Sequence, residues 1–241
     1  VRQIINLTQT TSGSYLLLAS LDISRRNLAL RGEESFAKVM DMAEYARREI
    51  NEIGGYYAYG KELVNGTSVY DYDVTKLSVH TLGLGLAGIE VYDLLRDEYD
   101  IQIEFGDVSN ILAYISIGDR LQDIERLVGA LADIARIYKK DSTGMLSGEF
   151  ISPIVARSPQ EAFYSAKESL PVEKTEGRIS GEFVMCYPPG IPILAPGEMI
   201  TDEIIQYILY VKEKGCSMQG TEDPAVEYLL SLIHISEPTR H

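Results

Sequence analysis

One acidic residue stands where the sequence could hold it firmly enough to bind a substrate. Glu198 follows Gly197 at the end of a run that holds four of the nine prolines of the chain, between positions 188 and 196. Proline fixes φ and removes a backbone donor, so the run predicts a stiff, extended path. A carboxylate at its end could bind an amine or a guanidinium. Alternatively, Glu198 is an acid ahead of a helix at Thr201, where the helix dipole favours it.

A group of hydroxyl residues could bind an anion. The stretch QTTSGSY, Gln9 to Tyr15, precedes a predicted helix and includes Thr11 and Ser12. Free backbone N–H groups at a helix start attract phosphate. The alternative is helix capping by Ser12 or Ser14, which needs only one hydroxyl. Both interpretations remain open on these residues alone.

A third motif is typical of dinucleotide binding. GLGLAG, Gly83 to Gly88, spells G-x-G-x-x-G between an expected strand and an expected helix, with Glu104 on the next strand. The first strand, residues 76–81, is less apolar than a buried parallel strand should be. No second mononucleotide-binding half follows, so tight packing of strand and helix is the alternative. His80 has no cysteine or second histidine near it, and we expect no metal site there.

Apolar periodicity predicts a mixture of helices and strands. Helices are expected at residues 15–31, 33–53, 89–99, 119–140, 159–168 and 201–214, and strands at 76–81, 101–105, 111–117 and 178–187. Gly32 is expected to separate the first two helices, and Asp119, Ser158 and Thr201 are expected N-caps.

The composition narrows the class of protein. The chain has 241 residues, 45% of them hydrophobic and 24% charged, with a formal net charge of −14. The negative charge argues against nucleic acid as a partner. No apolar run is long enough for a membrane helix, and no signal peptide is evident at the start. The two cysteines are expected to be reduced thiols.

Both ends of the sequence are unusual. Val1 stands where a start methionine would be, so we expect the reading frame to begin upstream. The stretch LSLIHISEPTR, Leu230 to Arg240, resembles the in-frame translation of a transposase adapter used in sequencing libraries. Residues 230–241 are therefore an expected artefact and are left out of the fold prediction.

Three segments together resemble one enzyme family. LTQTTSGSYLLLASLDISRR, IQIEFGDVSNILAYISIGD and GRISGEFVMCYPPGIPILAPGEMIT are similar to the C-terminal half of the bacterial ornithine/lysine/arginine decarboxylases, in the arginine decarboxylase branch. The resemblance implies an α/β (α+β) fold of the aspartate-aminotransferase type. Residues 1–35 would end the large domain, 36–140 form the small α+β domain, 141–150 a linker and 151–229 an additional C-terminal α+β domain.

The resemblance also implies an activity. The intact protein would use pyridoxal 5′-phosphate to convert arginine, or lysine or ornithine, to the corresponding amine and CO2 in cytoplasmic polyamine biosynthesis, as a homodimer or higher homo-oligomer. Thr11 and Ser12 match positions that contact the cofactor phosphate, although the family has proline where this chain has Gly13. Glu198 would bind the distal amino or guanidino group of the basic amino acid.

The catalytic lysine of the family is expected elsewhere. It lies in a Ser-x-His-Lys segment, and no His-Lys pair occurs in this sequence. We therefore expect it upstream of Val1, with no catalytic residue in this chain and no activity of the fragment alone. Two alternatives stay open: a nucleotide-binding oxidoreductase domain built on GLGLAG, and a non-catalytic regulatory or interaction module.

Overall fold

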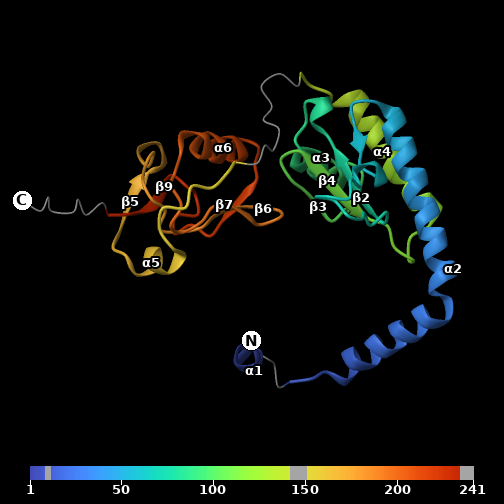
Figure 1. Ribbon diagram of the computed structural model, residues 1–241. Coiled ribbons are helices and arrows are strands. Elements are labelled where there is room, and N and C mark those ends of the chain that lie inside the picture. Colours follow the sequence, from blue (N-terminus) through green and yellow to red (C-terminus); the bar gives the residue numbers. More distant parts are fainter. Residues whose placement is uncertain (9–11, 142–150, 234–241) are drawn as a thin grey trace, which may run out of the picture.

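Two hydrophobic cores organise the chain in the computed structural model, which describes residues 1–8, 12–141 and 151–233 (Figure 1). We call the parts built on them the first unit, residues 39–138, and the second unit, residues 151–233. The elements up to residue 141 are α1 (Arg2–Thr8), α2 (Tyr15–Ile53), β1 (Tyr57–Ala58), β2 (Lys76–His80), α3 (Gly88–Asp97), β3 (Phe105–Gly106), β4 (Asn110–Tyr114) and α4 (Leu121–Ile137). Short 3-10 turns lie at Lys61–Leu63 and Leu82–Leu84.

The sheet of the first unit is antiparallel, with strand order β1-β2-β4-β3. Residues alternate between its two faces, as strand geometry requires. Leu77 pairs with Ala113 and Val79 with Ile111, and all four are buried. This face packs against α2, α3 and α4, whose apolar residues complete the core. The opposite face carries polar residues, among them His80.

Helix α2 is one continuous helix, so the predicted break at Gly32 is wrong. It starts behind Ser14, whose Oγ accepts a hydrogen bond from the backbone N–H of Leu17 at 3.5 Å, and ends at Gly54, where φ is 82°. Gly32 costs a helix about 1 kcal/mol relative to alanine but does not forbid it. The charged residues after it favour helix, and Glu34 pairs with Lys38 at 3.0 Å across the following turn.

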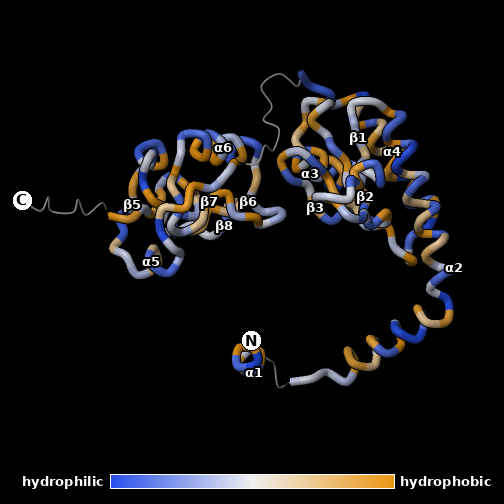
Figure 2. The backbone as a smooth tube through the Cα atoms, viewed as in Figure 1, coloured by the Kyte–Doolittle hydropathy of each residue, from blue (hydrophilic) through white to orange (hydrophobic). Residues whose placement is uncertain are grey.

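The N-terminal half of α2 projects away from the first unit (Figure 1). Figure 2 shows apolar residues interspersed with polar ones along it. Leu16, Leu21 and Leu30 are 83%, 66% and 71% exposed. Their positions put large apolar side chains in water on this part of the helix.

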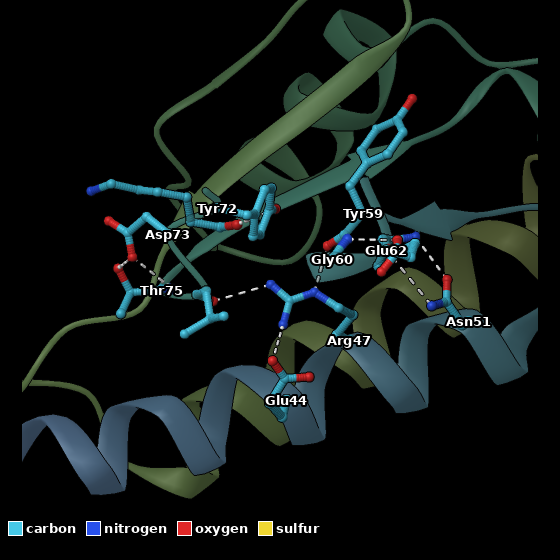
Figure 3. A network of polar contacts seen from close by, with 12 residues as sticks. Glu44, Arg47, Asn51, Tyr59, Gly60, Glu62, Tyr72, Asp73 and Thr75 are labelled. Carbon is cyan, nitrogen blue, oxygen red and sulfur yellow. Dashed lines mark hydrogen bonds and ion pairs between the residues drawn. The ribbon is translucent and has the colours of Figure 1, made fainter. Parts of the chain in front are cut away.

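Arg47 fastens the loop that follows β1 to helix α2 (Figure 3). Its side chain is buried, and its guanidinium donates to the backbone carbonyls of Tyr59 and Val74 and pairs with Glu44 at 3.1 Å. On the next turn Asn51 exchanges two hydrogen bonds with the backbone of Ala58, at 2.7 and 3.3 Å. These contacts fix the position of the segment that contains Tyr59.

The second unit holds two small sheets and one longer helix. Its elements are α5 (Pro159–Tyr164), β5 (Lys167–Pro171), a 3-10 turn at Val172–Lys174, β6 (Val184–Tyr187), β7 (Ile191–Leu194), α6 (Asp202–Glu213), β8 (Ser217–Gln219) and β9 (Tyr228–Leu232). The strands pair as β5-β9 and β7-β6-β8, all antiparallel. The apolar face of α6 supplies much of the core.

The predicted caps of the second unit are confirmed. Ser158 Oγ accepts from the N–H of Glu161, and Thr201 Oγ1 from that of Ile204, both at 3.3 Å. Helix α5 ends at Tyr164, four residues earlier than predicted. Strand β9 includes residues 230–232, where Leu232 pairs with Lys167, so the structure uses the first residues of the expected adapter tail. Residues 234–241 lie outside the described part of the chain.

Two local predictions in the first unit are wrong. Asp119 does not cap α4; its carboxylate accepts from the backbone of Ser116 at 2.6 Å and closes the preceding turn. Arg120 holds the N-cap position instead, and Asp123 accepts from its N–H at 3.0 Å. The strand predicted at 101–105 is confined to β3, Phe105–Gly106.

The predicted fold class, a mixture of helix and sheet, is confirmed. None of the described helices is long and apolar enough to cross a bilayer.

Candidate functional site between the two units

The two units meet through a small apolar contact. Val108 and Ile89 of the first unit pack with Cys186, Val211 and Cys216 of the second. Beside this contact lies a cavity of about 530 Å³ lined by residues from both units, which we call the interunit cavity. Its size falls within the range of small-molecule sites. The cavity is therefore the candidate site of this chain.

The polar wall of the interunit cavity is built on a tight turn before β4. Asp107 Oδ1 accepts from the backbone N–H groups of Ser109 and Asn110, at 2.7 and 2.6 Å. Such a turn is typical of aspartate. Asn110 Oδ1 lies 3.3 Å from both the Tyr59 hydroxyl and His80 Nδ1. These five residues all line the cavity, which places a carboxylate, a hydroxyl, a phenol, an imidazole and an amide on one side.

Ser109 adds an unusual feature to this wall. The residue is 7% exposed, and its Oγ has no hydrogen-bond partner among the described residues. Its backbone carbonyl is fixed by the N–H and the hydroxyl of Thr81, at 2.9 and 3.2 Å. Burying a hydroxyl without a hydrogen-bond partner costs free energy, so this Oγ points to a bound group that would form the hydrogen bond.

The opposite wall is apolar and comes from the proline run. The tip of the β6–β7 hairpin points toward the first unit (Figure 1). Gly190 shapes this tip with a φ of 87° and donates to the carbonyl of Cys186 at 2.9 Å. The peptide bonds on either side of Pro188 are cis. The residues that line the cavity here are Pro188, Pro189, Ile191, Pro192 and Ile193.

Most titratable groups of the interunit cavity are held neutral. Burial, with smaller effects of Cys186 and Asp107, raises the pKa of Tyr207 to about 12. Burial and the charge of Asp107 also raise the pKa of Tyr59. A hydrogen bond to Cys216 and burial raise the pKa of the Cys186 thiol. Among the described residues of the lining, Asp107 is the one acidic residue and there is no lysine or arginine.

The predicted substrate residue Glu198 lies outside the interunit cavity. It is half-buried, its Oε2 accepts from the N–H of Ala195 at 2.8 Å, and its backbone carbonyl accepts from Ser180 at 2.8 Å. Gly197 has a φ of 94° and lies against the Arg157 carbonyl. Glu198 is thus held by hydrogen bonds from the backbone of Ala195 and Ser180, and its predicted role in binding a substrate stays a prediction.

The predicted phosphate-binding residues lie at the start of α2. Ser12 is exposed there, and Thr11 falls outside the described residues. Ser14 performs the capping that was the alternative for this group. Neither Ser12 nor Glu198 lines the interunit cavity.

The GLGLAG motif is a packing motif, and the dinucleotide-binding interpretation is wrong. The strand before it, β2, and the strand after α3, β3, are not neighbours: both pair antiparallel with β4, which lies between them, whereas a dinucleotide site needs adjacent parallel strands. A Cβ on Gly83, Gly85 or Gly88 would meet the backbone carbonyls of Gly55, Lys140 and Asn110 respectively. The glycines therefore allow neighbouring backbone segments to approach closely, and these segments leave no room for a pyrophosphate.

Sequence comparisons relate the chain to amino-acid decarboxylases. Residues 148–224 match the family model described as the C-terminal domain of Orn/Lys/Arg decarboxylase. The chain is 40% identical to the arginine decarboxylase of Bacillus subtilis over 232 residues, which are 95% of this chain and 47% of that protein. It is 42% identical to the arginine decarboxylase of Halalkalibacterium halodurans over 92% of this chain and 46% of that protein.

The comparisons thus support similarity of this chain to the C-terminal part of the Orn/Lys/Arg decarboxylases. It spans about half the length of the curated relatives it matches. Among solved structures, the constitutive lysine decarboxylase of Escherichia coli superposes with a TM-score of 0.69 and 18% identity, over 96% of this chain and 45% of that one. The family fold thus contains both units described above.

The sequence analysis named the prolines, His80 and Cys186 but did not place them in a common site, and it singled out none of the other polar residues of the interunit cavity. Tyr59, Asp107, Ser109 and Tyr207 carry no motif. The one local signal was Asp-x-Ser-Asn at 107–110, a turn-forming pattern directly before an apolar strand.

Proposed function

We propose that the protein to which this chain belongs decarboxylates arginine, with lysine or ornithine as the alternative substrate. One observation carries the proposal: identity of 40–42% to arginine decarboxylases over at least 92% of the chain. Identity to the constitutive lysine decarboxylase of Escherichia coli is 30% and covers 43% of the chain. The product would be an amine for polyamine biosynthesis in the cytoplasm.

The proposed cofactor is pyridoxal 5′-phosphate. When bound, it supplies the electron sink for the pair left behind as the α-carboxylate departs as CO2. Ser12 is exposed beside the N-terminal end of α2, a 39-residue helix, so a hydroxyl and the positive end of a helix dipole adjoin there. This donor set fits a phosphate, and we assign Ser12 and Thr11 the role of donating hydrogen bonds to it.

Glu198 is proposed to bind the distal cation of the substrate. Its Oε2 is anchored by Ala195, which fixes the plane of the carboxylate, and Oε1 has no partner among the described residues. A guanidinium can donate to a carboxylate through two parallel N–H groups, whereas a primary amine presents a single point charge. The proposed pairing therefore favours arginine.

A homodimer or higher homo-oligomer is the proposed assembly. The exposed leucines of α2 would be unusual on a free surface in water. Relatives are about twice as long as this chain. We propose that the rest of the longer protein, together with a second copy, covers this part of α2.

The test restores the upstream coding sequence from the genome and measures CO2 release from arginine, lysine and ornithine by the purified full-length protein. Release from arginine with the highest kcat/KM is expected. No release from any of the three would overturn the proposal and favour a non-catalytic module. A Ser-x-His-Lys segment upstream is expected in the same sequence.

A pair of variants tests Glu198 within that protein. Glu198→Gln should raise KM for arginine more than tenfold, because a charge-assisted hydrogen bond is worth about 1.5–3 kcal/mol. Glu203→Gln removes an equal charge from the exposed surface of α6 and should leave KM unchanged. Equal KM values for the two variants would refute the role of Glu198.

A further inference from the structure

We propose that the interunit cavity binds a linear aliphatic amine or guanidine that carries no carboxylate. This is the product class of the proposed decarboxylation, so the biological identity of the ligand rests on the proposed function. Binding itself does not, because the cavity lies wholly within this chain and contains neither Ser12 nor Glu198.

The polar wall supplies the recognition of a cation. Asp107 commits Oδ1 to its own turn, at 2.7 and 2.6 Å from two backbone N–H groups, while Oδ2 has only a 3.5 Å contact with the Asn110 amide. Oδ2 can therefore accept a hydrogen bond from an ammonium or guanidinium. Ser109 Oγ, buried two residues away and without a partner, can accept or donate a second bond. Asp107 Oδ2 thus offers the acceptor for one N–H-rich group, with the buried hydroxyl of Ser109 on the same turn.

The apolar wall fits a chain of methylenes. Pro188, Pro189, Ile191 and Pro192 present hydrocarbon surface with no side-chain donor or acceptor. The prolines also lack a backbone N–H, so this wall offers few groups that water could bind. Burying the methylenes of a ligand against this wall is favourable, because it removes apolar surface from water. An alkyl chain is thus preferred over a polar one.

The charges of the lining exclude the substrate of the same reaction. None of the described residues that line the cavity is a lysine or arginine, so an α-carboxylate would enter without a matching cation from them and close to Asp107. Like charges at short range in a partly buried site repel strongly. The cavity therefore discriminates between an amine and the amino acid from which it is made, as a site that senses product would.

The experiment is an NMR titration of the 241-residue chain, without cofactor, with 4-aminobutylguanidine, 1,4-diaminobutane, arginine and 1-butanol as probes. Shifts of the amide signals of residues 107–110 and 186–193 should report the two cationic amines, and arginine should bind at least tenfold more weakly. Ser109→Ala, which breaks no bond within the described chain, should weaken binding of the amines severalfold. Asp107→Asn keeps an acceptor for the backbone N–H groups of the turn and should weaken binding of the amines at least tenfold.

The control is Glu125→Gln, which removes one negative charge from the exposed surface of α4 and should leave the affinity unchanged. The amide spectrum of each variant shows whether the fold is kept. Equal affinities of wild-type and Asp107→Asn protein, or shifts spread over the acidic surface, would overturn the proposal. Arginine binding as tightly as its decarboxylated form would overturn it as well. A full-length protein without decarboxylase activity whose cavity binds amines would refute the proposed function and leave this site intact.

Discussion

Replacing Arg47 by methionine should markedly destabilise the first unit. The Arg47 side chain is 7% exposed and donates to two backbone carbonyls, those of Tyr59 and Val74, the second at 3.0 Å (Figure 3). These carbonyls belong to the loop between β1 and β2. Methionine fills a similar volume but provides no donor, so both carbonyls would lose their partner.

The magnitude follows from these contacts. A buried polar group left without its partner costs about 1–3 kcal/mol, so two carbonyls together cost about 2–6 kcal/mol. The ion pair with Glu44 adds little, because the Glu44 side chain is 56% exposed and stays hydrated without Arg47. We expect about 3–4 kcal/mol for Arg47→Met, and about half of this for Arg47→Lys, whose ammonium can reach one of the carbonyls.

Urea denaturation followed by far-ultraviolet circular dichroism measures the effect, with hydrogen exchange of the β2 and β4 amides to assign it to the first unit. Arg48→Met is the matched control: its side chain is 66% exposed, pairs with Glu49 at 3.4 Å and lies 5.6 Å from the Tyr45 ring centroid, so a change within about 0.5 kcal/mol is expected. A loss below 1 kcal/mol in Arg47→Met would show that water replaces the guanidinium at both carbonyls. The assignment of Arg47 as the anchor of this loop would then be refuted.

Three further predictions follow from single contacts. Gly88→Ala should destabilise the first unit by about 2 kcal/mol or more in urea denaturation, because its Cβ would collide with the Asn110 carbonyl and the backbone must shift. Thr201→Ala removes the N-cap of α6 and should cost about 1 kcal/mol, whereas Thr201→Ser should cost less than half of that. Three backbone N–H groups lower the pKa of Asp223 below its usual 3.8, so its carboxylate stabilises the folded state above pH 3.8 and this contribution is lost as the pH falls through the lower folded value. Asp223→Asn should therefore flatten the acid side of the stability curve, measured by thermal unfolding between pH 2 and 6.

Local signals in the sequence predicted local structure well. Ser158 and Thr201 were identified as N-caps because the hydrogen bond that defines a cap lies within three residues. The predicted helix end at Gly32 was wrong because glycine marks helix ends only on average. Its small penalty within a helix was outweighed by the helix-favouring residues around it. The prediction for Asp119 failed because its carboxylate accepts from the backbone of Ser116 in the preceding turn, and Arg120 holds the N-cap position.

The interunit cavity could not be predicted in the same way. Its polar wall lies at residues 107–110 and its apolar wall at 186–193, about eighty residues further along the chain. Each wall taken alone has an ordinary explanation, a turn before a strand and a hairpin tip. The apolar contact of Val108 and Ile89 with Cys186, Val211 and Cys216 brings the two walls together, and sequence spacing carries no information about such a contact.

Most of the proline run lines the interunit cavity, whereas the Glu198 carboxylate is held by the backbone N–H of Ala195. The sequence suggested that the prolines hold Glu198 over a reaction centre. In the structure Glu198 is fixed by bonds from Ala195 and Ser180, beyond the end of β7, so the prolines are not needed for that purpose. Pro188, Pro189 and Pro192 instead face the interunit cavity. The side chains of this wall carry no donor or acceptor, so the polar side chains that could bind the polar end of a ligand lie on the opposite wall, with Asp107 and Ser109. The same residues that make a poor strand thus make a one-sided binding site.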